Sequence, residues 1–160
     1  MAAPKRGNTG YSCYFITAST FEKRRLLQSE RMARLLIDVL FHYRQQGKFQ
    51  LHEFVVMPDH FHLLITPVET LERAMQPIKG GFSFRVKKEL GFCGEVWQKS
   101  YHDRRVRDFH EYAAFREYMR ENPIRKGLAS EASEYLYSSA HPSFNLDGIP
   151  QRLKPIGLSA

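Results

Sequence analysis

The sequence FQLHEFVVMPDHFHLLIT occupies residues 49–66 and predicts two strands joined by a turn. Two runs rich in β-branched and aromatic residues, 49–57 and 60–66, lie on either side of Pro58-Asp59. Such runs predict strands, and the Pro-Asp pair predicts the turn that joins them. Pro67 directly follows the second run and is expected to end it.

The second of these strands carries two histidines two positions apart. Because strand side chains alternate between faces, His60 and His62 project together, while Phe61, Leu63 and Ile65 form an apolar face on the other side. We expect the apolar face to lie against the core, which places the two imidazoles side by side on the opposite face. There they could bind a metal ion between them, but an isolated His-x-His pair equally fits two ordinary hydrogen-bonded histidines.

Strand and helix patterns alternate along the rest of the chain. The predicted elements are a strand at 11–19, a helix at 30–46 from Ser29 to Gly47, a helix at 69–90, a strand within 95–107 and a helix at 108–121. Pro77 and Gly80-Gly81 predict a kink or two short helices, and Asn122-Pro123 should end or bend the last helix.

The order β-α-β-β-α-β-α predicts an α+β ferredoxin-like sandwich. We expect an antiparallel sheet with helices on one face, plus an additional C-terminal helix that bears Tyr118. Periodicity fades after about residue 129, where prolines become frequent. The predicted organisation is therefore one domain over 11–128 and an irregular tail over 129–160, which wraps the domain surface or is mobile.

Composition indicates a protein that binds a polyanion. The 160 residues include 24 Lys plus Arg against 17 Asp plus Glu, which gives a formal charge of +7. Nucleic acid is the commonest partner of so basic a domain. Two cysteines suggest a reducing cytosol rather than a disulfide framework. With no apolar leader at the start and no run long enough to span a bilayer, we expect a cytoplasmic, nucleoid-associated protein without a membrane partner.

Basic side chains gather in four stretches of the sequence. They are Lys23/Arg24/Arg25, Arg85/Lys87/Lys88, Lys99/Arg104/Arg105/Arg107 and Arg116/Arg120/Arg125/Lys126. A single cluster is usually a solvated face, but four clusters, two of them beside the histidine pair, better fit a track for a phosphate backbone.

The last predicted helix carries a possible partner for the histidines. Tyr118 and Asn122 are four residues apart and hence neighbours on one helical face. Tyr118 lies on the flank of the apolar stripe, so its ring can reach the sheet while its hydroxyl stays in water. Tyrosine is also common as a plain boundary residue of an amphipathic helix.

Three runs of the sequence resemble the HUH (His–hydrophobic–His) single-tyrosine transposases of the IS200-like family. HEFVVMPDHFHLLITP (52–67) resembles the signature of that family, while VWQKSYHDRRVRD (96–108) and YMRENPIRKGL (118–128) resemble its REP-associated branch. The tail segments YSSA (137–140) and GIPQRLKP (148–155) are similar to the same branch. The resemblance covers about residues 11–155, with fitting spacing between the runs.

The resemblance implies a role for each residue of the candidate site. His60, His62 and Asn122 would bind a divalent metal ion, Mn²⁺ or Mg²⁺, and Tyr118 would be the nucleophile. The implied reaction cuts and rejoins single-stranded DNA next to REP-like hairpins through a 5′-phosphotyrosine intermediate. For the DNA contacts we expect Lys99, Arg104, Arg105, Arg85, Lys87, Lys88 and Arg125.

Two other classes of function stay open at this point. A non-catalytic nucleic-acid-binding regulator would have the same fold and charge, although it would not need His60, His62, Tyr118 and Asn122 together. A histidine-triad phosphohydrolase needs a longer run of alternating histidines, which Leu64 interrupts. The sequence leaves open the target hairpin, the physiological metal, whether the protein is mobile or domesticated, and whether it is a monomer or a homodimer.

Overall fold

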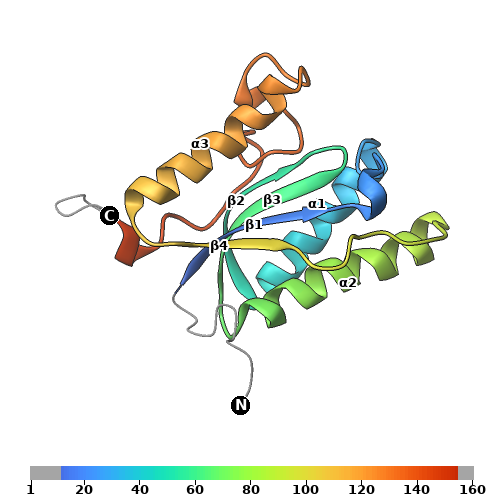
Figure 1. Cartoon of the computed structure of the whole chain (residues 1–160), viewed down its shortest axis with the longest axis horizontal. Coiled ribbons are helices and arrows are strands. Elements are labelled where there is room, and N and C mark those ends of the chain that lie inside the picture. Colours follow the sequence, from blue (N-terminus) through green and yellow to red (C-terminus); the bar gives the residue numbers. More distant parts are fainter. Residues whose placement is uncertain (1–11, 155–160) are drawn as a thin grey trace.

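The computed structural model describes residues 12–154 (Figure 1). Its main elements are β1 (Cys13–Ser19), α1 (Glu30–Gln45), β2 (Phe49–Val56), β3 (His60–Pro67), α2 (Leu71–Leu90), β4 (His102–Val106) and α3 (Phe109–Arg125). Short 3-10 turns are η1 (Phe21–Lys23), η2 (Ala132–Glu134) and η3 (Gln151–Leu153). Tyr11 of the first predicted strand and residues 155–160 of the predicted tail lie outside the described residues.

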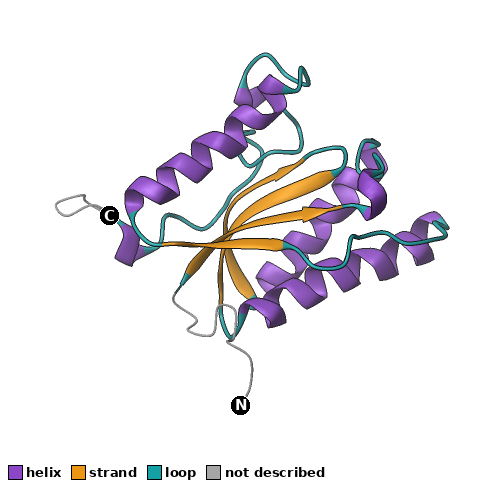
Figure 2. Ribbon diagram, viewed as in Figure 1, coloured by secondary structure: helices purple, strands orange, loops and turns teal. Residues whose placement is uncertain are grey.

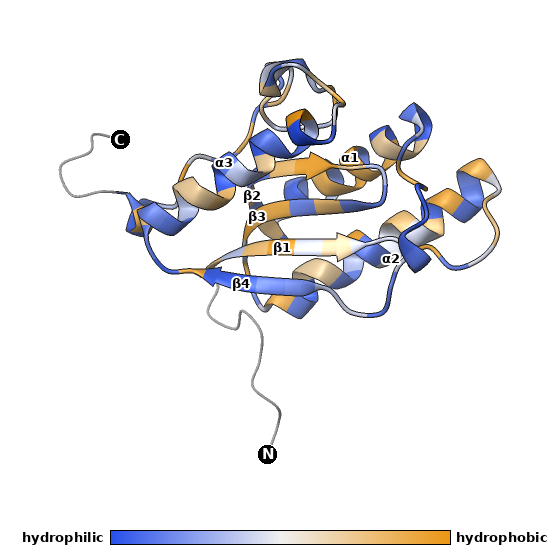
Figure 3. Cartoon of the chain, turned by 45° about the horizontal axis from the view of Figure 1, so that its top comes forward, coloured by the Kyte–Doolittle hydropathy of each residue, from blue (hydrophilic) through white to orange (hydrophobic). Residues whose placement is uncertain are grey.

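The strands form one antiparallel sheet in the order β2-β3-β1-β4. This order, reached by two β-α-β halves, confirms the predicted α+β ferredoxin-like sandwich. Helices α1 and α2 cover one face of the sheet, and α3 lies on the other (Figure 2). The edge strand β4 is the most hydrophilic strand (Figure 3), and such charged edges resist pairing with other sheets.

Strands β1, β2 and β3 are largely buried on both faces, because each alternates two sets of mostly apolar side chains. Ile16, Phe54 and Phe61 point into the layer with α1 and α2 and are fully buried. The opposite layer joins strand residues to α3 and to the tail. Its buried members are Cys13, Phe15, Val55, Met57, Leu64, Val106, Tyr112, Met119, Tyr135 and Leu153.

The sequence predicted a kink or two short helices in the second helical segment, and the second alternative is wrong because α2 is a single helix. Pro77 lies inside α2. The glycines have a packing role instead of ending a helix. A Cβ at Gly81 would lie 2.8 Å from Cε2 of Tyr43, so glycine allows α1 and α2 to pack closely. Tertiary contact here outweighs the weak helix propensity of glycine and proline.

The prediction that α3 ends at residue 121 is also wrong, since α3 continues to Arg125 with Pro123 inside it. The helix ends at Gly127, whose φ of 73° is in the left-handed region. The backbone N–H of Leu128 donates to the Pro123 carbonyl at 2.8 Å, and that of Gly127 to the Ile124 carbonyl at 3.0 Å. These paired bonds form a Schellman motif, which satisfies carbonyls at the helix end.

The segment after α3 lies along the outer edge of β2. The N–H of Val56 donates to the Tyr137 carbonyl at 2.8 Å, and the N–H of Ser139 donates to the Phe54 carbonyl at 2.9 Å. The tail thereby satisfies backbone groups that an edge strand would leave open. The boundary between the domain at 11–128 and the tail at 129–160 stays a prediction. No helix within residues 12–154 is long and apolar enough to cross a bilayer.

Candidate active site

The two histidines of the motif lie side by side at the start of β3. The ring centroids of His60 and His62 are 4.8 Å apart, with the ring planes at 75°. The turn before them is closed by a 2.8 Å hydrogen bond from the Met57 N–H to the His60 carbonyl. Strand alternation and a tight turn therefore bring both imidazoles to the face of the sheet that α3 covers.

Each histidine has one ring nitrogen engaged by a neighbour. Nδ1 of His60 lies 2.7 Å from an Asp59 carboxylate oxygen, and Nδ1 of His62 lies 2.9 Å from the Thr17 hydroxyl. Although partial burial acts against it, the bond from His60 lowers the pKa of Asp59, so this carboxylate is ionised at neutral pH. Partners at Nδ1 orient both rings and leave Nε2 as the nitrogen available to a ligand.

His62 is buried, with 3% of its surface exposed. Burial, with a smaller effect of neighbouring His60, lowers the pKa of His62 to about 3. The imidazole is therefore neutral at physiological pH, which is the form that binds metals. Its Nε2 atom is buried and has no hydrogen-bond partner among the described residues.

Helix α3 brings Tyr118 and Asn122 to the same region. The Tyr118 ring centroid lies 5.4 Å from that of His62, and the side chain is 45% exposed. One turn further on, Asn122 is 3% exposed, and its Nδ2 atom has no hydrogen-bond partner within residues 12–154. The Arg125 guanidinium lies 4.7 Å from the Tyr118 ring centroid, where a cation is attracted to the ring face.

The donor set fits a divalent metal ion. His62 and Asn122 each hold a buried polar atom that has no partner within residues 12–154, and a half-turn of the Asn122 amide would present its oxygen in place of its nitrogen. Two imidazoles and an amide oxygen suit Mn²⁺ better than Mg²⁺, which prefers oxygen ligands. No group of three His, Cys, Asp or Glu side chains able to hold a metal occurs in the described part of the chain, so such a site would depend on Asn122.

The predicted DNA-binding residues of β4 divide between the two faces of the sheet. Arg104 pairs with Phe15, on the face of α3, whereas Arg105 pairs with Tyr14, on the face of α1 and α2. Lys99 and Arg104 line a hollow of about 550 Å³ that also includes Thr17, the partner of His62. The structure thus places Lys99 and Arg104 in one hollow with Thr17, and pairs Arg105 with Tyr14 on the other face of the sheet.

The basic residues of α2 lie away from the candidate site. Arg85, Lys87 and Lys88 belong to the helix on the opposite face of the sheet. Arg85 forms 2.6 Å ion pairs with both Asp38 and Glu89, and these bonds raise its pKa. Its charge is therefore largely compensated within the protein.

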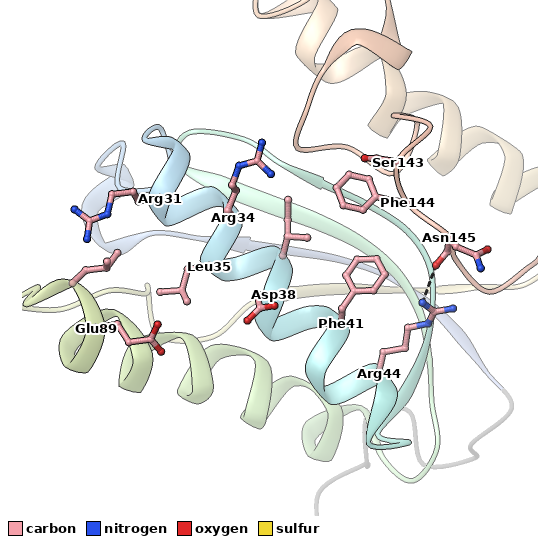
Figure 4. Close-up of a pocket in the computed structure, with 12 residues that line it drawn as sticks. Arg31, Arg34, Leu35, Asp38, Phe41, Arg44, Glu89, Ser143, Phe144 and Asn145 are labelled. Carbon is pink, nitrogen blue, oxygen red and sulfur yellow. Dashed lines mark hydrogen bonds between the residues drawn. The ribbon is translucent and has the colours of Figure 1, made fainter.

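A second hollow, of about 890 Å³, lies between α1, the end of α2 and the tail (Figure 4). Its walls combine apolar Leu35, Phe41 and Phe144 with charged residues that are mostly paired. Arg44, for example, donates to the Asn145 carbonyl at 2.8 Å. The hollow contains neither the histidine pair nor Tyr118, so it contributes nothing to the candidate site.

Sequence reasoning missed two residues that orient the histidines, Asp59 and Thr17. Asp59 directly precedes His60, so its proximity was available from the sequence. Thr17 is 45 positions from His62 and becomes its neighbour only through the pairing of β1 with β3. Only a correct strand register could have identified it.

Comparison with known proteins identifies the family. The model of a family described as "Transposase IS200 like" matches residues 10–122, which include both histidines, Tyr118 and Asn122. The chain therefore belongs to the IS200-like transposase family. Within it, the chain is similar to REP-associated tyrosine transposases, which confirms the resemblance seen in the sequence.

Two relatives and two solved structures illustrate this similarity. Identity is 23% over 134 residues with the REP-associated tyrosine transposase of Escherichia coli K12 (80% of this chain, 76% of that protein). Identity is 22% over 170 residues with the putative REP-associated tyrosine transposase of Haemophilus influenzae (94% of this chain, 92% of that protein). The structure of a REP-associated tyrosine transposase bound to a REP hairpin matches with a TM-score of 0.72 at 20% identity (100% and 92%). The crystal structure of a putative transposase from Deinococcus radiodurans matches with a TM-score of 0.52 at 26% identity. The match covers 73% of this chain and 95% of that chain.

Proposed function

We propose that this transposase is a metal-dependent endonuclease that cuts and rejoins single-stranded DNA beside hairpins, with Tyr118 as its nucleophile. One observation carries the proposal. A partly exposed tyrosine lies against a buried, neutral histidine whose Nε2 atom has no partner within residues 12–154, and one helical turn from the tyrosine the Nδ2 atom of Asn122 likewise has none. Buried polar atoms without hydrogen-bond partners destabilise a fold. A role for them in cleaving a phosphodiester would account for their presence here.

His60, His62 and Asn122 would hold a divalent cation, Mn²⁺ or Mg²⁺, which would neutralise a non-bridging phosphate oxygen and orient the scissile bond. Asp59 and Thr17 hold the two imidazoles so that Nε2 of each is available. Because such partners fix the ring orientation, they contribute to metal affinity without contacting the metal.

Tyr118 attacks the scissile phosphorus through its phenolic oxygen. The new bond joins this oxygen to phosphorus, the bond from phosphorus to the 3′-oxygen breaks, and the proton lost from the phenol is balanced by one gained at the 3′-oxygen. The products are a 5′-phosphotyrosine linkage and a free 3′-hydroxyl. Because the covalent link conserves the phosphodiester bond energy, rejoining to another 3′-hydroxyl needs no ATP.

The DNA is expected to approach over the hollow beside Thr17. Lys99 and Arg104 line it, and Arg125 lies against Tyr118, so all three can contact phosphates near the cleavage point. A solved relative is bound to a REP hairpin, which supports hairpin DNA as the substrate class. Such a substrate implies association with the nucleoid, and we place the protein there as a monomer or a homodimer.

The decisive experiment detects the covalent intermediate. Protein is mixed with labelled single-stranded DNA that carries the hairpins found beside its own gene, Mn²⁺ is added, and a denaturing protein gel is run. Label should migrate with the protein, require metal and disappear in Tyr118→Phe. Tyr43→Phe is the matched control, because Tyr43 lies on α1 and packs on the opposite face of the sheet from the histidines.

The same experiment decides against the proposal if no adduct forms with any metal while hairpins still bind tightly. That result would favour the second class of function, a non-catalytic nucleic-acid-binding regulator on the same fold. Tyr118 would then be a boundary residue of α3.

A further inference from the structure

We propose that Glu53 is a positioning residue of the transposase. Through Arg120 it fixes α3 at the position in which Tyr118 and Asn122 serve the site. This inference rests on the proposed function, because it assigns a task to a contact that lies outside the reacting groups.

An irregularity in β2 directs the Glu53 side chain toward α3. The pairing of β2 with β3 shifts register between Leu51 and Glu53. After the shift Glu53 pairs with Leu64, whose side chain lies in the layer that α3 covers. Bulges commonly re-aim a side chain next to a functional site. Here the bulge places a carboxylate with 8% exposure under the tyrosine-bearing helix.

Glu53 joins three parts of the chain. Nη2 of Arg120, on α3, lies 3.3 and 3.2 Å from the two carboxylate oxygens. The Ser139 hydroxyl, in the tail, donates to Glu53 at 2.8 Å. Burial of a carboxylate is costly unless it has such partners. A movement of α3 that broke the contact between Arg120 and Glu53 would therefore be unfavourable.

The ion pair lies on the opposite flank of α3 from the tyrosine. At about 100° per residue, Arg120 is about 200° further around the helix than Tyr118. Between these flanks, Phe115 and Met119 pack against the sheet through apolar contacts. Apolar contacts are not directional, so they resist rolling of the helix poorly. The bonds to Glu53 are directional and hold the far flank, and thereby set how closely Tyr118 approaches His62.

The test compares two ion-paired carboxylates, of which Glu53 also accepts a hydrogen bond from the tail and Asp147 lies in it. Glu53→Gln keeps the shape of the side chain and removes its charge. Asp147→Asn is the matched control, because Asp147 binds Arg44 at 2.9 Å and the Leu51 N–H at 2.8 Å without touching α3. Single-turnover adduct formation at saturating Mn²⁺, hairpin affinity and amide exchange in α3 are measured for both variants.

For Glu53→Gln, adduct formation should slow by about 10- to 100-fold, since small misplacements of reacting groups have effects of this size. Hairpin affinity should stay within about threefold of wild type, and amides of residues 116–124 should exchange faster. Asp147→Asn should change the rate by less than about threefold. Arg120→Lys, which keeps the charge but loses the fork geometry, should lie in between.

The inference is overturned if Glu53→Gln reacts as fast as Asp147→Asn, or if its α3 amides exchange at the wild-type rate. Should Glu53→Gln fail to fold, Arg120→Lys decides by the same comparison. If wild type forms no adduct, the proposed function fails, and amide exchange still decides whether Glu53 holds α3.

Discussion

Two histidines are buried in the layer between the sheet and α3, and they differ in what their ring nitrogens meet. His52 is 2% exposed, and both of its nitrogens are hydrogen-bonded, at 2.8 Å to the Thr66 hydroxyl and at 2.8 Å to the Gly148 carbonyl. His62 is 3% exposed, and among the described residues its Nδ1 bonds to the Thr17 hydroxyl while its Nε2 has no hydrogen-bond partner.

This difference separates a region in which both ring nitrogens are hydrogen-bonded from one in which a ring nitrogen has no partner among the described residues. Around His52 every polar group of the ring is satisfied, and the bonds tie the tail to the sheet. Around His62 the part of the chain that the structure describes leaves a buried nitrogen without a partner, an arrangement that costs about 1–3 kcal/mol. We infer that the region around His62 is kept for a ligand, whereas the region around His52 is kept for stability.

The largest expected effect is on chemistry. His62→Ala should slow adduct formation by on the order of 100-fold or more, because loss of a metal ligand removes several kcal/mol of charge stabilisation. In the metal-free protein its free energy of unfolding should change by only about 1 kcal/mol, because an unsatisfied nitrogen is removed together with packing. Single-turnover rates and urea unfolding check this. A stability loss as large as that of His52→Ala would mean that His62 also has a structural role.

The converse variant should affect stability. His52→Ala leaves the Thr66 hydroxyl and the Gly148 carbonyl without their partner and opens a cavity, so it should destabilise the protein by about 2–4 kcal/mol. Adduct formation, measured well below the unfolding temperature, should stay within about threefold of wild type. Urea unfolding and the gel assay measure both quantities, and a loss of activity without a loss of stability would contradict the structural role of His52.

A third test uses pH. Because burial lowers the pKa of His62 from 6.5 to about 3, protons bind the unfolded chain more readily than the folded one. The stability linked to this group is fully present above pH 6.5 and is lost progressively as the pH falls toward 3. Between pH 7 and 5 it should decrease by about 2 kcal/mol in metal-free protein.

The variant His62→Ala provides the control for the pH experiment. It should lose less stability over this pH range than wild type, because the titrating group is gone. His52 also has a pKa lowered by burial, so part of the pH dependence should remain. Identical pH profiles for wild type and His62→Ala would rule out the expected contribution of His62.

The smallest expected effects concern the two neighbouring arginines of β4. Arg104→Ala should weaken hairpin binding a few-fold and reduce the salt dependence of binding by about one ion, because Arg104 lies on the face of the site. Arg105→Ala should leave that dependence unchanged, since Arg105 points to the other face. Binding titrations at several salt concentrations distinguish the two. Equal effects would mean that the DNA also covers the face of α1 and α2.

Periodicity in the sequence predicted the strands and their faces well. Alternation in β3 predicted that His60 and His62 lie together, and their ring centroids are indeed 4.8 Å apart. Local sequence patterns gave wrong helix boundaries where contacts between residues distant in the sequence determine the structure. Gly81 was interpreted as a helix breaker because its close contact with Tyr43 depends on how α1 packs on α2. Asn122-Pro123 was predicted to end or bend the last helix, whereas α3 continues past it and Gly127 supplies the backbone conformation that ends the helix.

The site shows the same limit. His60, His62, Tyr118 and Asn122 were identified from motifs, and their metal-binding and catalytic roles stay predictions. Their supporting contacts were not found, because Thr17 comes from another strand, and the link from Glu53 to α3 depends on an irregular register in β2. Alternation over a regular strand gives no signal for a bulge.

Whether His62 is a metal ligand is tested most directly by a Mn²⁺ titration monitored by electron paramagnetic resonance. We predict one Mn²⁺ site per chain in wild type and in His52→Ala, with coupling to imidazole nitrogen. In His62→Ala we predict that this site is lost. If His62→Ala binds Mn²⁺ with the affinity and spectrum of wild type, the unpartnered nitrogen of His62 is not a metal ligand, and the distinction between the two buried histidines is wrong.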